Sequence, residues 1–266
     1  GLFRWGLFVF NWTYPDDLVA QLDIKVDIPK TATSTGVKID LLVDLYEGFM
    51  VNPNGCNYYL EKSITREELA KKEIRTQKVL RHLFVPRVKC QGTISYQNSK
   101  NKEISFTLKD TPGLYIDAVQ GLTPNKAAKR WNFLCYQDKI RSIICMEFTT
   151  IEEYNDTTVT VWCSTEHNKI ASVGSSTSKT RVEFENTEKD VENGWYYPTS
   201  ITFPMGFKEE KLKLVNRYDV MGELPYIVRS LAENIAKIKP FIYQYCQDSN
   251  YKGEEGISII ESTFIS

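Results

Sequence analysis

Short segments in which apolar and polar residues alternate recur through residues 88–215, and this recurrence constrains the fold more than any other feature of the sequence. Alternation with period two is typical of a strand with one buried face. Turn-forming residues separate the segments, at 98–100, 111–113, 166–168, 174–176 and 193–194. The segments are Val88–Tyr96, Ile104–Leu108, Tyr115–Val119, Trp131–Tyr136, Ser142–Thr150, Thr157–Cys163, Lys169–Val173, Arg181–Glu185, Ser200–Phe203 and Lys211–Val215. Strands that recur about every ten to twelve residues predict an antiparallel sandwich or barrel.

The N-terminal residues predict a β-hairpin. Residues 1–12 are apolar on both faces of a period-two ribbon, and residues 22–28 alternate after a turn at Tyr14–Asp17. A helix on a membrane surface is the alternative for the first dozen residues. Their density of aromatic and β-branched residues, without a capping residue, favours the buried strand. A further apolar run over residues 38–60 contains a turn at Asn52–Gly55.

Helices are predicted at three places. Thr65 and Glu68 have capping-box spacing, which predicts a short helix from Ile64. Thr123 and Pro124 are a cap and a first-turn proline for a helical turn over residues 125–130. Apolar residues at helical spacing between Leu224 and Ile238 predict an amphipathic helix over residues 223–238. Its apolar face packs on the β structure or on another protein, and we prefer the first. Closing strands follow at 241–245 and 257–265.

Composition excludes several classes of function. The formal charge of −1 argues against nucleic acid as a partner, and no apolar run approaches the roughly 18 residues that cross a bilayer. Six cysteines without a CxxC pair indicate a reducing cytosol and no metal site. No glycine-rich phosphate loop occurs, so no nucleotide cofactor is expected. His82 and His167 belong to no catalytic constellation, and Glu147 is the best single carboxylate for proton transfer. We favour an exposed or arginine-paired Glu147.

Aromatic residues are the positive indication of function. Trp131, Phe133, Tyr136, Phe148, Tyr154 and Trp162 lie in three successive segments with period-two placement. Several of these rings therefore share a face, which in a closed barrel is the interior. A barrel interior can enclose an apolar cavity for one small ligand, or the rings can fill it completely. Composition alone leaves the two alternatives equal.

Several motifs in a fixed order resemble those of the fungal survival-factor family of double lipocalin-like proteins. They are Val119–Pro124, Ala127–Phe133, Met146–Thr150, Tyr154–Val159, Arg217–Pro225, Lys239–Tyr245 and Glu261–Ser266. The resemblance covers residues 81–266, and Arg81–Arg87 resembles the join between that family's two halves. It departs at Asn125 and Lys126, where the family has a histidine pair.

The resemblance implies two lipocalin-like antiparallel β-barrel halves. The N-terminal half, residues 1–86, is short or incomplete, and residues 87–266 form the complete barrel with helix 223–238. It also implies a cytosolic, non-enzymatic carrier that transfers ceramide or a similar sphingolipid between endoplasmic reticulum and Golgi membranes, with peripheral membrane contact and a role in survival under oxidative stress. No cofactor and no metal are implied, and the oligomeric state is not predicted.

Six residues are predicted to form the ligand site. Trp131, Phe133, Phe148 and Trp162 are expected to line the cavity, with Arg130 and Asn132 as polar groups near its mouth. Trp131 and Asn132 point to opposite faces in a regular strand, so both lie inside only if the strand has a bulge. One alternative is a lipocalin-like hydratase or isomerase of a long-chain lipid, with Glu147 or Asp117 as the acid. The other is a solid-barrel, stress-related interaction module that binds a partner through the Leu224–Ile238 helix or its open N-terminal half.

Overall fold

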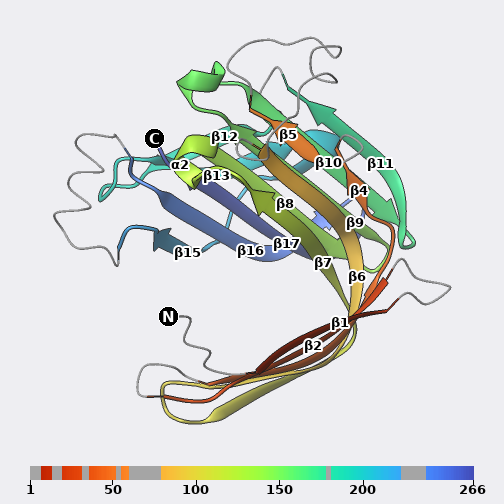
Figure 1. Cartoon of the computed structure of the whole chain (residues 1–266). Helices are drawn as coiled ribbons and strands as arrows, with labels where there is room; N and C mark the ends of the chain where they lie inside the picture. Colours follow the sequence, from red (N-terminus) through yellow and green to blue (C-terminus); the bar gives the residue numbers. More distant parts are fainter. Residues whose placement is uncertain are drawn as a thin grey trace. The chain divides into compact units, whose positions relative to one another are not determined.

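The computed structural model describes residues 7–13, 20–31, 36–51, 55–59, 79–177, 181–222 and 238–266. These residues are mainly β-strand (Figure 1). Successive strands near the N-terminus and in the C-terminal half pair in antiparallel fashion. The mainly β, antiparallel class predicted from the alternation is therefore confirmed. The strands are β1 (Leu7–Thr13), β2 (Ala20–Ile28), β3 (Val37–Leu45), β4 (Phe49–Met50), β5 (Cys56–Tyr58), β6 (Val79–Gln97), β7 (Glu103–Gln120), β8 (Arg130–Asp138), β9 (Arg141–Thr149), β10 (Thr158–Glu166), β11 (Lys169–Ser176), β12 (Glu183–Lys189), β13 (Tyr196–Phe203), β14 (Phe207–Glu209), β15 (Leu214–Asp219), β16 (Phe241–Tyr251) and β17 (Glu254–Phe264).

The chain divides into two compact units, the first of which comprises residues 1–49, 84–115 and 167–169. In it, β1 pairs with β2, β2 with β3, and β3 with β6. The predicted N-terminal hairpin is thus confirmed as β1–β2, whereas its turn at Tyr14–Asp17 lies outside the described residues. Residues of β2, β3 and β6 form a small core of Ala20, Leu22, Val43, Leu45, Val85 and Val88.

The second unit comprises residues 50–83, 116–166 and 170–266. A seven-stranded sheet has the order β11-β10-β9-β8-β17-β16-β15, and a three-stranded sheet has the order β12-β13-β14. Its hydrophobic core joins one face of the larger sheet to the smaller one, and we call that face the core face. The core includes Leu134, Tyr136, Ile143, Ile201, Phe203, Phe207, Tyr243, Tyr245 and Ile260. Alternation predicts a strand well where its even- and odd-numbered residues differ in burial, as they do in most of β17.

The turn predicted at Thr111–Gly113 is wrong, because β7 continues through these residues to Gln120. Asp110, just before them, has a positive φ of 50°, which is an irregularity within the strand rather than its end. Among the described strands β7 pairs with β6 alone, and an edge strand tolerates the missing N–H of Pro112. The turn predicted at residues 166–168 is confirmed, because His167 and Asn168 lie between β10 and β11 with φ of 49° and 66°.

One predicted helix is observed, as α2 (Pro124–Ala127), with Thr123 at its N-cap position and Pro124 in its first turn. The helix expected from Ile64 and most of the helix expected over residues 223–238 lie outside the described residues. β6 runs without interruption through Pro86 and Arg87, where we placed the boundary between the two halves, and that division stays a prediction. Within the described parts of the chain, no helix is long and apolar enough to span a membrane.

Candidate functional site

A largely apolar pocket of about 580 Å³ lies against the face of the seven-stranded sheet opposite its core face. We call it the outer pocket. Its lining comes from β8, β9, β16 and β17, from Pro124 and Asn125 of α2, and from residues 220–221 and 238–240, which flank the segment outside the described residues. Such a volume lies within the roughly 300–1,000 Å³ typical of small-ligand sites. The full lining is Pro124, Asn125, Trp131, Asn132, Phe133, Met146, Val220, Met221, Ile238, Pro240, Ile242, Glu261, Thr263 and Ile265.

Strand register explains why these residues meet. β8 pairs with β17 so that Trp131 lies opposite Thr263 and Phe133 opposite Glu261. β17 pairs with β16 so that Thr263 lies opposite Ile242. Side chains directly opposite each other on one face are about 5 Å apart, so they form continuous rows across the sheet. The row that begins with Phe133 of β8 continues through Glu261 of β17 to Gln244 of β16, so an aromatic ring is followed by two polar groups.

Three of the predicted aromatic residues share this face. Trp131 and Phe133 are half-buried and line the outer pocket. Phe148 is fully buried, and its ring centroid lies 4.8 Å from that of Trp131. Tyr59 also stacks with Phe148, with 6.4 Å between ring centroids. Phe148 therefore contacts Trp131 from the neighbouring strand β9 and is not itself part of the pocket lining.

Trp162 lies on the opposite face. In the register of β9 and β10 it pairs with Cys145, a core residue, and its ring packs against the core of the second unit. Gly174 of β11 leaves room for the indole, because a Cβ at that position would lie 2.1 Å from Trp162 Cζ2. The structure therefore separates Trp162 from the other three predicted aromatic residues.

The side chains of Arg130 and Asn132 point to the core face, where they meet Glu147, although Asn132 is also among the residues that line the outer pocket. The buried amide of Asn132 accepts a hydrogen bond from Ser262 at 3.0 Å and lies 3.5 Å from a Glu147 oxygen. The Arg130 guanidinium pairs with Glu147 at 3.6 Å and lies over the ring of Phe184. Arg130 lines a second pocket of about 450 Å³, which it shares with Lys129, Thr149, Thr158, Trp195, Tyr196, Phe264 and Ser266. Trp131 and Asn132 thus point to opposite faces, as a regular strand requires.

Glu147 is an acceptor for surrounding donors. Its carboxylate accepts hydrogen bonds from the backbone N–H groups of Arg181 (2.7 Å) and Val182 (3.0 Å) and from the Thr160 hydroxyl (2.8 Å). With 1% exposure and Arg130 beside it, Glu147 corresponds to the arginine-paired interpretation. Asp117, the other candidate acid, forms an exposed ion pair with Arg81 at 3.0 Å. Neither carboxylate lines the outer pocket.

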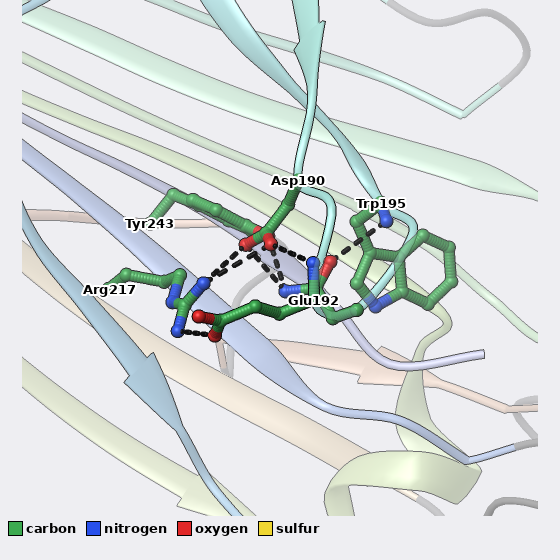
Figure 2. A network of polar contacts seen from close by, with 6 residues as sticks. Asp190, Glu192, Trp195, Arg217 and Tyr243 are labelled. Carbon is green, nitrogen blue, oxygen red and sulfur yellow. Dashed lines mark hydrogen bonds and ion pairs between the residues drawn. The ribbon is translucent and has the colours of Figure 1, made fainter.

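A polar network on the core face joins β15 to β16, and β16 also lines the outer pocket (Figure 2). Asp190, between β12 and β13, accepts hydrogen bonds from Tyr243 of β16 at 2.8 Å and from Arg217 of β15 at 3.0 Å. Burial favours a higher pKa for Asp190, but hydrogen bonds from Tyr243, the Glu192 N–H and Arg217 outweigh burial and lower it. Because side chains alternate, Ile242 and Gln244 of the same β16 face the outer pocket side. The network therefore holds β15 and β16 from the core face.

Sequence reasoning missed the C-terminal half of the outer pocket. Ile242, Glu261, Thr263 and Ile265 come from β16, β17 and the residue after it, more than 100 positions from β8. Their segments did appear among the family motifs, but alternation gives no information on which strand a closing strand pairs with. To predict these pocket residues, one would need to know that β17 pairs with β8 and β16 with β17.

Residues 10–266 match the model of the Svf1 family. An uncharacterized SVF1-like protein of Saccharomyces cerevisiae is 57% identical over 252 residues, covering 93% of this chain and 62% of that protein. The ceramide-binding protein SVF1 of Debaryomyces hansenii is 32% identical over 273 residues, covering 95% of this chain and 67% of that protein. The chain thus spans about three fifths of the length of its Saccharomyces cerevisiae relatives.

Among solved structures, an AttH protein from Nitrosomonas europaea superposes with a TM-score of 0.51 at 10% sequence identity. The superposition covers 96% of this chain and 68% of that one. At this identity the likeness concerns the fold alone, and it agrees with the lipocalin-like class predicted from the sequence.

Proposed function

This chain belongs to the Svf1 family, and we propose that it binds an apolar lipid, ceramide or a similar sphingolipid, without transforming it. The observation on which the proposal depends is the outer pocket, with Trp131, Phe133 and Ile242 among its lining residues. Relatives named ceramide-binding proteins support the choice of lipid.

The outer pocket suits a lipid for physical reasons. An acyl chain gains roughly 25 cal/mol for each Å² of its surface that leaves water, so it needs a wall of carbon atoms and few polar contacts. Trp131, Phe133, Met146 and Ile242 provide such a wall on rigid strands. The polar residues Glu261 and Thr263 lie on the adjacent strand, where a polar head can reach them. The pocket therefore has an apolar part for the acyl chains and a polar part for the head group.

We also propose that the protein acts as a carrier. A lipid held in an apolar pocket can cross water between two membranes, and we propose the endoplasmic reticulum and the Golgi as these membranes. Such a carrier works from the cytosol through peripheral membrane contact, and its role is survival under oxidative stress. The family resemblance supports these assignments, and a transfer assay between donor and acceptor vesicles tests the carrier step.

The positions of the candidate acids support a role without catalysis. Glu147 is directed to the core face and accepts bonds from Thr160, Arg181 and Val182, away from the pocket. Asp117 is engaged with Arg81. A lipid in the outer pocket would meet neither of them, so we expect it to leave the protein unchanged.

The test is lipid uptake by the purified chain. Vesicles that contain ceramide are incubated with the protein, and native mass spectrometry then measures the fraction of protein that carries lipid. Phe133→Ala removes a ring from the pocket wall, and we expect its ceramide affinity to fall about 10-fold or more. The matched control is Phe106→Ala, because Phe106 is 51% exposed on β7 and does not line the pocket.

Two results would contradict the proposal. One is that the wild-type chain takes up no ceramide from vesicles. The other is that Phe133→Ala and Phe106→Ala retain equal affinity, because the pocket would then not be the site. Release of a modified lipid would instead support the hydratase alternative.

A further inference from the structure

We propose that Glu261 selects the head group of the bound lipid, favouring an uncharged head with hydroxyl or amide donors and excluding an anionic head. This inference rests on the proposed function and assigns the ligand chemistry of the same pocket. Glu261 is half-buried on β17, where it lines the outer pocket beside Phe133. Among the lining residues that the structure describes, it alone carries a charge.

The carboxylate is held in a fixed orientation by its neighbours. Gln244 Nε2 of β16 donates to one oxygen of Glu261 at 3.1 Å, and Thr263 Oγ1 donates to the other at 3.2 Å. The amide of Gln244 is itself oriented, because its oxygen accepts a hydrogen bond from Asn216 Nδ2 of β15 at 2.9 Å. Asn216 and Gln244 are thus positioning residues that present Glu261 to the pocket.

Acceptor capacity remains for a ligand. An ionised carboxylate offers about four lone-pair sites, and Gln244 and Thr263 use one on each oxygen. A head group with two donors, such as a hydroxyl and an amide N–H, can fill the remaining sites. Bonds of this kind to a charged acceptor are stronger than bonds between neutral groups. Ceramide has this set of donors.

The same charge discriminates against anionic lipids. A phosphate or carboxylate head placed beside Glu261 would meet a like charge in a pocket wall of low polarity, formed by Phe133, Trp131 and Ile242. Like charges repel more strongly where water is scarce. Specificity of this kind comes from a repulsive element against the wrong ligand as well as from attraction to the right one.

Competition between two lipids that differ only in the head tests the inference. Vesicles contain ceramide and ceramide 1-phosphate with identical chains, and native mass spectrometry gives the ratio of the two lipids bound. We expect the wild-type chain to prefer ceramide. Glu261→Gln removes the charge at constant shape, and the ratio should shift toward the phosphate by about 10-fold or more. Glu255→Gln, an exposed position on the same strand, is the matched control and should keep the wild-type ratio.

A second variant covers the case in which Glu261→Gln does not fold. Glu261→Asp keeps the charge but withdraws it by one methylene, so it should still exclude the phosphate while ceramide binds more weakly. Equal uptake of both lipids by the wild type, or an unchanged ratio in Glu261→Gln, would overturn the assignment of Glu261 and leave lipid binding intact. Uptake of neither lipid would instead overturn the proposed function.

Discussion

Replacing Glu147 by alanine leaves a group of buried donors without an acceptor. The carboxylate accepts bonds from Thr160, Arg181 and Val182 at 2.7–3.0 Å and pairs with Arg130. Each buried donor that loses its acceptor costs about 1–3 kcal/mol, and such losses are not additive within one network. We therefore expect Glu147→Ala to lower the free energy of unfolding by about 4 kcal/mol. Glu147→Gln retains one acceptor oxygen and should lower it by about 2 kcal/mol.

Urea titration followed by circular dichroism measures this loss of stability. Hydrogen exchange shows which backbone amides lose protection. The amides of Arg181 and Val182 should exchange faster in Glu147→Ala than in the wild type, because their acceptor is gone. Glu166→Gln is the control, since Glu166 is 51% exposed and pairs with Arg141 at 3.6 Å. It should change the stability by less than about 1 kcal/mol.

Stability of Glu147→Ala within about 1 kcal/mol of the wild type would refute this account of the buried network. The same variants also test whether Glu147 affects lipid binding or only the stability of the fold. Because Glu147 faces away from the outer pocket, folded Glu147→Gln should bind ceramide with wild-type affinity. Loss of ceramide from a fully folded Glu147→Gln would contradict the placement of the site.

Three further predictions concern other parts of the second unit. The folded-state pKa of Asp190 is lowered, so Asp190 stabilises the folded protein at pH values above the ordinary Asp pKa of about 3.9. This stabilisation is lost as the pH falls through the lower folded-state pKa. When the free energy of unfolding is measured against pH, Asp190→Asn should lack this acid-dependent loss. Gly174→Ala places a methyl group against Trp162 and should lower the unfolding free energy by about 1–3 kcal/mol, with a change in tryptophan fluorescence. Burial raises the pKa of Cys163 to about 12, so only about one thiol in ten thousand is ionised at pH 8, and mass spectrometry should find iodoacetamide on half-buried Cys246 well before Cys163.

Much of the second unit could be predicted from local sequence. Strands β16 and β17 alternate between a more buried core face and a less buried outer face, so their sequences alternate as well. In β9, by contrast, every residue after Arg141 is buried. Turn residues with positive φ, such as His167 and Asn168, mark the hairpin between β10 and β11. The turn predicted at Thr111–Gly113 is wrong because the same residue types are tolerated inside a strand such as β7, which pairs with one neighbour among the strands that the structure describes.

The site was predicted only in part, because the face of a residue depends on register as well as on parity. Trp131 lies opposite Phe148 in the pairing of β8 with β9, whereas Trp162 lies opposite Cys145 in the pairing of β9 with β10. Turn lengths fix these registers, and they place Trp162 on the other face. Glu261 could not be found from alternation at all, since its role follows from the pairing of β17 with β8.

Photo-cross-linking tests the central claim most directly. The purified chain is loaded with a ceramide that carries a photoactivatable group in its acyl chain, illuminated, digested and mapped by mass spectrometry. We expect adducts on the strands of the outer pocket, at residues 131–133, 238–242 and 261–265. Adducts confined to the first unit, or an adduct pattern that Phe133→Ala leaves unchanged, would contradict the claim that this protein binds its lipid in the outer pocket.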